Sequence, residues 1–228
     1  EGIKKVSYSN YNLPDLAIID PMLTVSMPPK VTADTGVDAL VHAIESFVSF
    51  NATPFSDLLA LEAIQLISQS LPRAYSKGED LSARYDMSFA ALLAGMSITS
   101  GGLGAVHALA YPIGTEFHQN HGRSNGIILP HVMEFNLIGN LKKYSTIAEA
   151  MGECIEGLNL FEAAERSVSA VKRLLEMVNI SYRLRDYGIP KESIPKLVEG
   201  GIKQSRLFVP NPRNLTKEDV TALYTKAW

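Results

Sequence analysis

Apolar residues recur at steps of three and four along most of this chain, which is the spacing of one face of an α-helix. The clearest run has apolar residues at Val37, Leu40, Val41, Ile44 and Val48. Three polar residues within 32–35 precede this run, and their side-chain oxygens predict the N-cap of its helix. Further helices are predicted at residues 57–70, 79–100, 105–111, about 124–138, 142–151, 160–178, 191–200 and 216–227. The predicted fold class is therefore mainly α, a multi-helix domain.

Prolines and glycines predict where these helices end. Pro72 is predicted to stop the second helix, and Pro112 with Gly114 to interrupt the fourth, because proline lacks a backbone N–H. The glycine cluster at 101–104 separates the third helix from the fourth, and residues 119–122 are predicted to form a polar turn.

The first thirty residues have a different pattern. Residues 3–8 and 16–19 are short β-prone runs separated by turn-forming residues. One or two short strands cannot bury a sheet face by themselves, so we interpret them as the last strands of a sheet whose other members are missing. The predicted division is residues 1–30 as remnant strands and linker, and residues 31–228 as a helical domain.

Composition excludes several classes of protein. The 228 residues are 46% hydrophobic and 20% charged with a net charge of −3, and no basic run indicates a nucleic-acid partner. No apolar run approaches the roughly 20 residues of a membrane helix, and the start does not resemble a signal peptide. The single cysteine, Cys154, excludes a disulfide framework, favours a reducing compartment and is predicted to pack on a helix. We therefore expect a cytoplasmic protein without nucleic-acid or membrane partners.

Asp38 and His42 are four residues apart, which places both on the same face of the predicted helix. A carboxylate and an imidazole so placed can chelate one cation, although such a pair is more often a simple surface pair. The neighbours Ala39, Leu40 and Val41 are apolar, and an unpaired carboxylate among them would be costly. This context favours a cation site.

The other histidines supply further candidate ligands. His107 lies in an apolar helix with no local partner for its imidazole, where a lone histidine is usually a satisfied core residue. His118 and His121 flank Gln119-Asn120 of the predicted polar turn, and Gly122 permits a sharp bend there. His131 lies on an amphipathic helix and is predicted to be structural. One carboxylate with up to three imidazoles suits Fe(II), Zn(II), Co(II) or Ni(II) better than Ca(II) or Mg(II).

Several signatures of other enzymes are absent from the sequence. The chain has no His-Glu-x-x-His, no His-Asp and no Gly-x-Ser-x-Gly motif. Gly102-x-Gly104 continues with His107 where a dinucleotide fingerprint needs a third glycine. We interpret these glycines as a helix break that lets His107 approach a site.

Three segments, at residues 33–45, 102–114 and 121–130, resemble in order the three metal motifs of the iron-containing (group III) alcohol dehydrogenases. The spacings between them also agree, and Asp20-Pro21 and Asn211-Pro-Arg213 are further family features. The resemblance extends over essentially the whole chain, and three ordered motifs together are highly specific. It implies that residues 31–228 are the domain that binds metal and substrate, and that residues 1–30 are the remnant of a nucleotide-binding domain. It also implies four metal ligands, which are Asp38, His42, His107 and His121.

The chain departs from the family pattern at positions near the expected substrate cleft. Tyr111 stands where many members carry a second histidine with a role in proton transfer. Tyr111 and His118 are therefore the candidate proton-relay residues, and His118 is not a ligand. Ile98 and Ser100 replace a frequent aromatic residue and asparagine, which would reshape the pocket.

The resemblance implies a metal-dependent oxidoreductase that interconverts an alcohol and an aldehyde or ketone. The cofactors would be Fe(II), with Zn(II) as a replacement, and NAD or NADP in the full-length protein. Family members carry an N-terminal α/β domain with a Gly-Gly-Gly-Ser loop for the dinucleotide. This chain has no such loop, so we expect a C-terminal fragment that is inactive by itself. We also expect a homo-oligomer that acts on a small-molecule alcohol or aldehyde.

Two alternatives differ in class. One is a lyase resembling dehydroquinate synthase, which is similar in plan but usually uses a glutamate and two histidines. The other is a non-catalytic, metal-binding helical domain.

Overall fold

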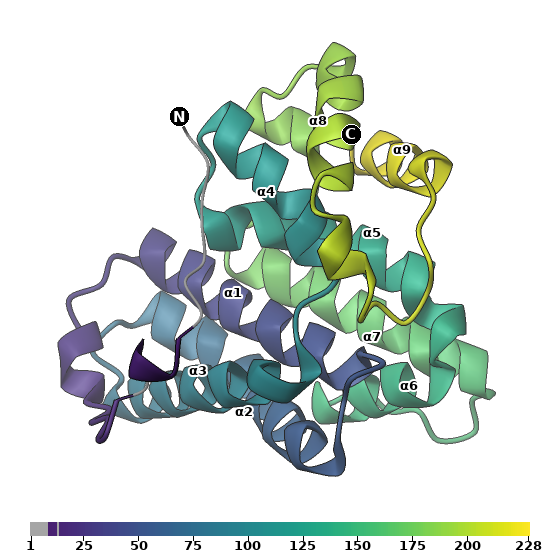
Figure 1. The fold of residues 1–228 in the computed structure, drawn as a ribbon. Helices are drawn as coiled ribbons and strands as arrows, with labels where there is room; N and C mark the ends of the chain where they lie inside the picture. Colours follow the sequence, from purple (N-terminus) through teal and green to yellow (C-terminus); the bar gives the residue numbers. More distant parts are fainter. Residues whose placement is uncertain (1–8, 13) are drawn as a thin grey trace.

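The computed structural model describes residues 9–12 and 14–228, and within them helices connected by loops and turns form the structure, with no strand (Figure 1). The α-helices are α1 (Pro29–Val48), α2 (Pro54–Ser76), α3 (Leu81–Gly101), α4 (Ala105–Phe117), α5 (His121–Asn136), α6 (Leu141–Ala150), α7 (Leu160–Met177), α8 (Ile194–Ile202) and α9 (Lys217–Ala227). Short 3-10 helices lie between several of them. The mainly α fold class is confirmed.

Helix α1 is the centre of the molecule. It packs against α2 and α3 on one side and against α5 on the other, and its apolar face, including Val37, Leu40 and Ile44, is almost completely buried. Helix α4 packs on α5 and α8, and α9 packs on α8 and α5. Figure 1 shows α8 and α9 at the end of the molecule opposite α2 and α3. The core therefore extends from α2 and α3, through α1, α4 and α5, to α8 and α9.

Two predicted helix ends were wrong. Helix α2 continues past Pro72 to Ser76, and α4 continues past Pro112 and Gly114 to Phe117. Each proline costs one backbone hydrogen bond, but tertiary packing outweighs that loss. Leu71 is fully buried beside Pro72, and Pro112 packs so closely on α8 that a Cβ at Gly200 would lie 2.7 Å from its Cβ atom.

The predicted N-cap at residues 32–35 was also wrong. Helix α1 begins at Pro29, where the proline ring is already set for the first helical position, so Thr32 and Asp34 lie inside the helix. Cys154, predicted to pack on a helix, is exposed in the segment between α6 and α7, because α6 ends at Ala150.

The predicted strands are not part of the described structure. Residues 3–8 lie outside the described residues, and residues 16–19 are exposed and form neither helix nor strand. A strand requires a partner to pair with, and the described part of the chain offers none there. Asp20 instead caps the 3-10 helix Pro21–Thr24 by accepting a hydrogen bond from the Met22 N–H at 2.9 Å.

None of the described helices is by itself long and apolar enough to cross a membrane. Helices α3 and α4 reach the required length and composition only as a pair, which is bent by 113° at the break between them.

Candidate metal centre

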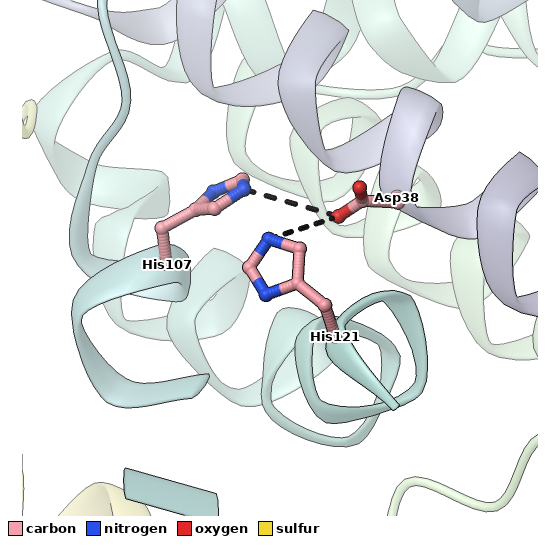
Figure 2. Close-up of side chains that lie close together, drawn as sticks. All are labelled: Asp38, His107 and His121. Atoms are coloured by element: carbon pink, nitrogen blue, oxygen red, sulfur yellow. Dashed lines mark ion pairs between the residues drawn. The ribbon is translucent and has the colours of Figure 1, made fainter. Parts of the chain in front are cut away.

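Helices α1, α4 and α5 each contribute one side chain to a compact cluster of Asp38, His107 and His121 (Figure 2). The Asp38 Oδ1 atom lies 3.5 Å from His121 Nε2 and 3.9 Å from His107 Nε2. One candidate ligand atom from each residue lies within 4.8 Å of the other two. Figure 2 shows both imidazoles turned toward the same carboxylate oxygen. Three residues that are far apart in sequence therefore converge on one point.

His42 lies at the edge of this cluster, one helical turn after Asp38. Its Nε2 atom is 4.0 Å from Asp38 Oδ2, as the four-residue spacing predicts. Its ring also stacks on that of His107, with centroids 4.9 Å apart and planes inclined by 11°. All four residues predicted as ligands are thus neighbours.

The start of α5 is held against α1 by a buried ionic contact. The Asp34 carboxylate accepts hydrogen bonds from Arg123 Nε and Asn120 Nδ2, each at 2.8 Å. Gly122 allows this approach, because a Cβ atom there would lie 1.8 Å from the Asp34 carbonyl oxygen. These contacts bring His121, the first residue of α5, over the Asp38 face of α1.

A buried carboxylate orients His107. Glu45 Oε2 lies 2.6 Å from His107 Nδ1, and both side chains are almost inaccessible to solvent. Glu45 Oε1 accepts a hydrogen bond of 2.6 Å from the Val106 N–H at the start of α4. The same carboxylate therefore accepts from a backbone N–H that has no partner within α4 and also contacts one nitrogen of the imidazole.

Asn125 lies behind the cluster on α5. Its Nδ2 atom donates to Asp38 Oδ1 at 2.6 Å and is also 3.2 Å from His107 Nε2 and 3.4 Å from His121 Nε2. An amide nitrogen at 2.6 Å from a carboxylate must be a donor, which fixes the orientation of the amide. Its Oδ1 atom is buried without a hydrogen-bond partner in the described structure. One amide nitrogen thus lies within 3.4 Å of an atom of each cluster residue.

The distances from Asp38 Oδ1 to the two imidazole nitrogens are compatible with a cation bound by all three atoms. Two ligand atoms that each lie about 2.1 Å from one tetrahedral ion are about 3.4 Å from each other. The observed separations of 3.5 and 3.9 Å from Asp38 Oδ1 to the two imidazole nitrogens are close to this value. A carboxylate with imidazoles is a donor set for Fe(II), Zn(II) or a similar ion.

The two candidate relay residues are placed differently. The Tyr111 ring stacks on His121, with centroids 5.7 Å apart and planes inclined by 17°, and meets His107 edge-on at 6.5 Å. His118 is exposed at the C-terminal end of α4 in a left-handed conformation, and it is not a member of the described cluster. The structure therefore brings Tyr111 to the site and leaves His118 at the surface.

His131 lies away from the cluster and has a structural contact. Its Nε2 atom is 2.8 Å from the Tyr182 carbonyl oxygen, and its ring is buried. This burial lowers the pKa of the His131 imidazole, because removal from water disfavours the charged form.

Glu45 and Asn125 were missed by the sequence reasoning, although helical spacing carried a signal for both. Glu45 is seven residues after Asp38 and so lies on the same face of α1. Asn125 is four residues after His121 and lies one turn further along α5. Polar residues at these steps from a candidate ligand are natural places to search for its hydrogen-bond partners.

Comparison with known proteins agrees with this arrangement. Residues 32–228 match the Fe-containing alcohol dehydrogenase family, C-terminal. The chain is 43% identical over its full length to long-chain-alcohol dehydrogenase 1 of Geobacillus thermodenitrificans, and 40% identical over 99% of its length to 1,3-propanediol dehydrogenase of Klebsiella pneumoniae. It covers 58% of each of these proteins, so it spans little more than half the length of the curated relatives.

A solved structure shows the same fold. The alcohol dehydrogenase from Oenococcus oeni superposes with a TM-score of 0.89 at 37% identity. The match includes 92% of this chain and 54% of that one. The similarity therefore extends over nearly all of the helical architecture that surrounds the cluster.

Proposed function

Because this chain belongs to the Fe-containing alcohol dehydrogenase family, we propose that it is the metal-binding part of an oxidoreductase that interconverts an alcohol and an aldehyde or ketone with NAD or NADP. The observation that carries this proposal is the convergence of Asp38, His107 and His121 from three helices. Relatives named for long-chain alcohols and for 1,3-propanediol support an alcohol or aldehyde as the small-molecule substrate, without fixing its chain length.

The proposed metal ligands are Asp38, His42, His107 and His121, and the proposed metal is Fe(II), with Zn(II) as a possible replacement. When bound, such an ion acts as a Lewis acid toward an alcohol or carbonyl oxygen. The hydride chemistry belongs to the nicotinamide, which we expect the rest of a longer protein to bind.

The chain's own residues would position the ligands and move a proton. Asn125 holds the Asp38 carboxylate, and Glu45 holds His107. Tyr111 is the better placed of the two relay candidates, since its ring lies on His121, whereas His118 is exposed. We propose Tyr111 as the group that exchanges a proton with substrate, with His118 as a surface acceptor.

The remaining features of the proposal follow from the sequence. Residues 31–228 would form the helical domain, and residues 1–30 its connection to a dinucleotide-binding domain. A cytoplasmic homo-oligomer without nucleic-acid or membrane partners remains our expectation. The family match weighs against a lyase resembling dehydroquinate synthase, while a non-catalytic metal-binding domain is separated from the enzyme by assays with NAD(H) and NADP(H).

Metal titration of single variants tests the ligand set. We expect the wild-type chain to bind one Zn(II) or Co(II) ion, and His107→Ala and His121→Ala each to weaken binding by more than about tenfold, because loss of a direct ligand should exceed typical losses from outer partners. The melting temperature should rise with metal in the wild type and much less in the variants.

His131→Ala is the matched control, because it removes a buried histidine that lies outside the cluster. It should leave metal affinity unchanged while lowering stability. Equal loss of metal in all three variants would show that the wrong histidines have been chosen.

A further inference from the structure

Glu45 differs from Asp38, the acidic member of the cluster, because it is not itself one of the candidate ligands and contacts His107 from the side away from Asp38. Its side chain is 5% exposed, and its two oxygens accept from two different donors, the Val106 N–H and the His107 ring. We propose that Glu45 is a positioning residue that fixes the tautomer of His107, with the proton on Nδ1 and the lone pair on Nε2. This inference rests on the proposed function, since Nε2 is the atom assigned to the metal.

The two ring nitrogens of His107 are assigned by two independent contacts. A carboxylate only accepts hydrogen bonds, so Glu45 Oε2 at 2.6 Å requires a proton on Nδ1. On the other side, the amide nitrogen of Asn125 lies 3.2 Å from Nε2, and an amide nitrogen only donates. In a neutral imidazole one nitrogen carries the proton and the other carries the lone pair. Both contacts select the same tautomer.

Residue 45 must offer two acceptor oxygens, because it also accepts a hydrogen bond from the Val106 N–H. A backbone N–H is an obligatory donor, so one oxygen of residue 45 must accept from it. Only a second oxygen can then accept from His107 Nδ1. Glutamate has two acceptor oxygens, whereas glutamine of the same shape has one oxygen and one NH2 group.

Glu45→Gln therefore has a definite expected consequence. The amide oxygen would remain with the Val106 N–H, and the NH2 group would face His107 Nδ1 and require a lone pair there. The imidazole proton would move to Nε2, from which it would point toward Asp38 Oδ1, 3.9 Å away. Asn125 would keep its shorter bond of 2.6 Å to the same carboxylate. Such an imidazole has no lone pair on Nε2 for a metal.

A purely structural role for Glu45 as the cap of α4 predicts a different result. Asn211 supplies the comparison, because its Oδ1 atom accepts from the Ala105 N–H at the same helix end and does not contact His107. Asn211→Ala should lower the melting temperature without changing the His107 tautomer or the metal affinity. Stability alone therefore does not distinguish the two roles, but the tautomer does.

The test is nitrogen-15 NMR of the histidine rings in the metal-free chain, at a pH well above the ordinary histidine pKa of about 6.5. The five histidines include an internal reference, because His131 Nε2 faces the Tyr182 carbonyl oxygen and must carry the proton there. We expect wild-type His107 to show the opposite tautomer to His131, and Glu45→Gln to show the same one. Zn(II) or Co(II) affinity should fall about 10- to 100-fold in Glu45→Gln.

Several results would overturn the inference. A wild-type His107 with its proton on Nε2 would do so without any variant, even if Glu45→Gln failed to fold. Glu45→Gln with wild-type tautomer, or with a changed tautomer and wild-type metal affinity, would do so as well. A wild-type chain with the expected tautomer but without metal affinity would instead contradict the proposed function and support the tautomer assignment.

Discussion

At the scale of single residues, the Asp38 Oδ1 atom is the point that the other groups share. It accepts from Asn125 and lies within 4 Å of two imidazole nitrogens from different helices. A carboxylate in such a position needs positive charge or donated protons nearby, because its own burial is unfavourable. Asn125 supplies one donor, and a divalent cation would satisfy the remaining acceptors.

His131 permits a prediction about pH that is independent of the cluster. Burial lowers its folded-state pKa, and its Nδ1 atom has no hydrogen-bond partner among the described residues, so protonation would bury an unsatisfied N–H. The unfolded chain therefore takes up a proton at this residue more readily than the folded one. The free energy of unfolding should fall as pH falls from about 6.5 toward the lower folded-state pKa, and this contribution should be constant above about 7.5.

Urea unfolding of wild type and His131→Gln between about pH 5 and 8 measures this effect. Glutamine can still donate to the Tyr182 carbonyl oxygen but does not titrate, so the neighbouring charges of Glu134, Lys172 and Lys226 act equally on both proteins. The difference between the two free energies should change only in the acidic range. A difference independent of pH would contradict the pKa direction.

Sequence spacing at the residue scale predicted the neighbours on one helix and not those across helices. The four-residue step predicted that Asp38 and His42 are neighbours, and the structure places Asp38 Oδ2 4.0 Å from His42 Nε2. The approach of His107 and His121 to Asp38 was expected from the family motifs, since no local pattern connects residues on three helices. Glu45 and Asn125 required the tertiary structure, because their partners become visible only when α1, α4 and α5 are packed together.

At the scale of helices, the errors of prediction have one physical cause. Proline was assumed to end α2 and α4, yet both continue because neighbouring residues are buried against other helices. Likewise Asp34 has a side chain suited to an N-cap, but it lies in the second turn of α1 and pairs with Arg123. Local propensity amounts to about 3 kcal/mol or less per residue, which tertiary packing can exceed.

The close approach of α5 to α1 leads to a prediction for Gly122. A methyl group there would lie 1.8 Å from the Asp34 carbonyl oxygen, and backbone atoms cannot move aside as a flexible side chain can. Gly122→Ala should therefore separate the two helices and lower the free energy of unfolding by about 3 kcal/mol or more. Metal affinity should fall as well, because His121 is the adjacent residue.

Gly95→Ala is the control for Gly122→Ala, since Gly95 also lies within an α-helix but has no atom within 4 Å of an added Cβ. Alanine is the better helix former, so this change should stabilise the chain by about 0.5–1 kcal/mol. Chemical denaturation of both variants gives the comparison. Similar effects of the two changes would argue against the tight α1–α5 contact.

At the scale of the whole molecule, the cluster connects three helices that pack together, because α1, α4 and α5 each contribute one of its residues. The sequence predicted most of the helices, because most of them have an apolar period of their own, as α7 and α8 do. It did not predict their arrangement, which depends on contacts between residues distant in sequence, such as Gly101 against Ser46 and Gly122 against Asp34.

The glycine cluster at 101–104 could in principle bind a phosphate, because it precedes the N-terminus of α4. In the structure this place is taken by the chain's own carboxylate. Glu45 Oε1 accepts from the Val106 N–H and would lie 3.1 Å from a Cβ at Gly104. At the start of α5 the Asp34 carboxylate accepts hydrogen bonds from the side chains of Asn120 and Arg123. The start of α4 is therefore occupied by a carboxylate, and the start of α5 by the ion pair of Asp34 with Arg123, so neither offers a free cradle for a phosphate.

We therefore predict that these 228 residues by themselves bind a divalent metal but neither NAD(H) nor NADP(H). Hydride transfer requires the nicotinamide to be held in contact with the substrate carbon, and a dinucleotide needs a cradle of free N–H groups for its phosphates. Calorimetric titration with each nucleotide should show no heat of binding in samples that bind Zn(II) or Co(II) normally, which controls for folding. Micromolar binding of either nucleotide, or turnover of a short primary alcohol, would mean that the chain holds a dinucleotide at a place other than these two helix ends.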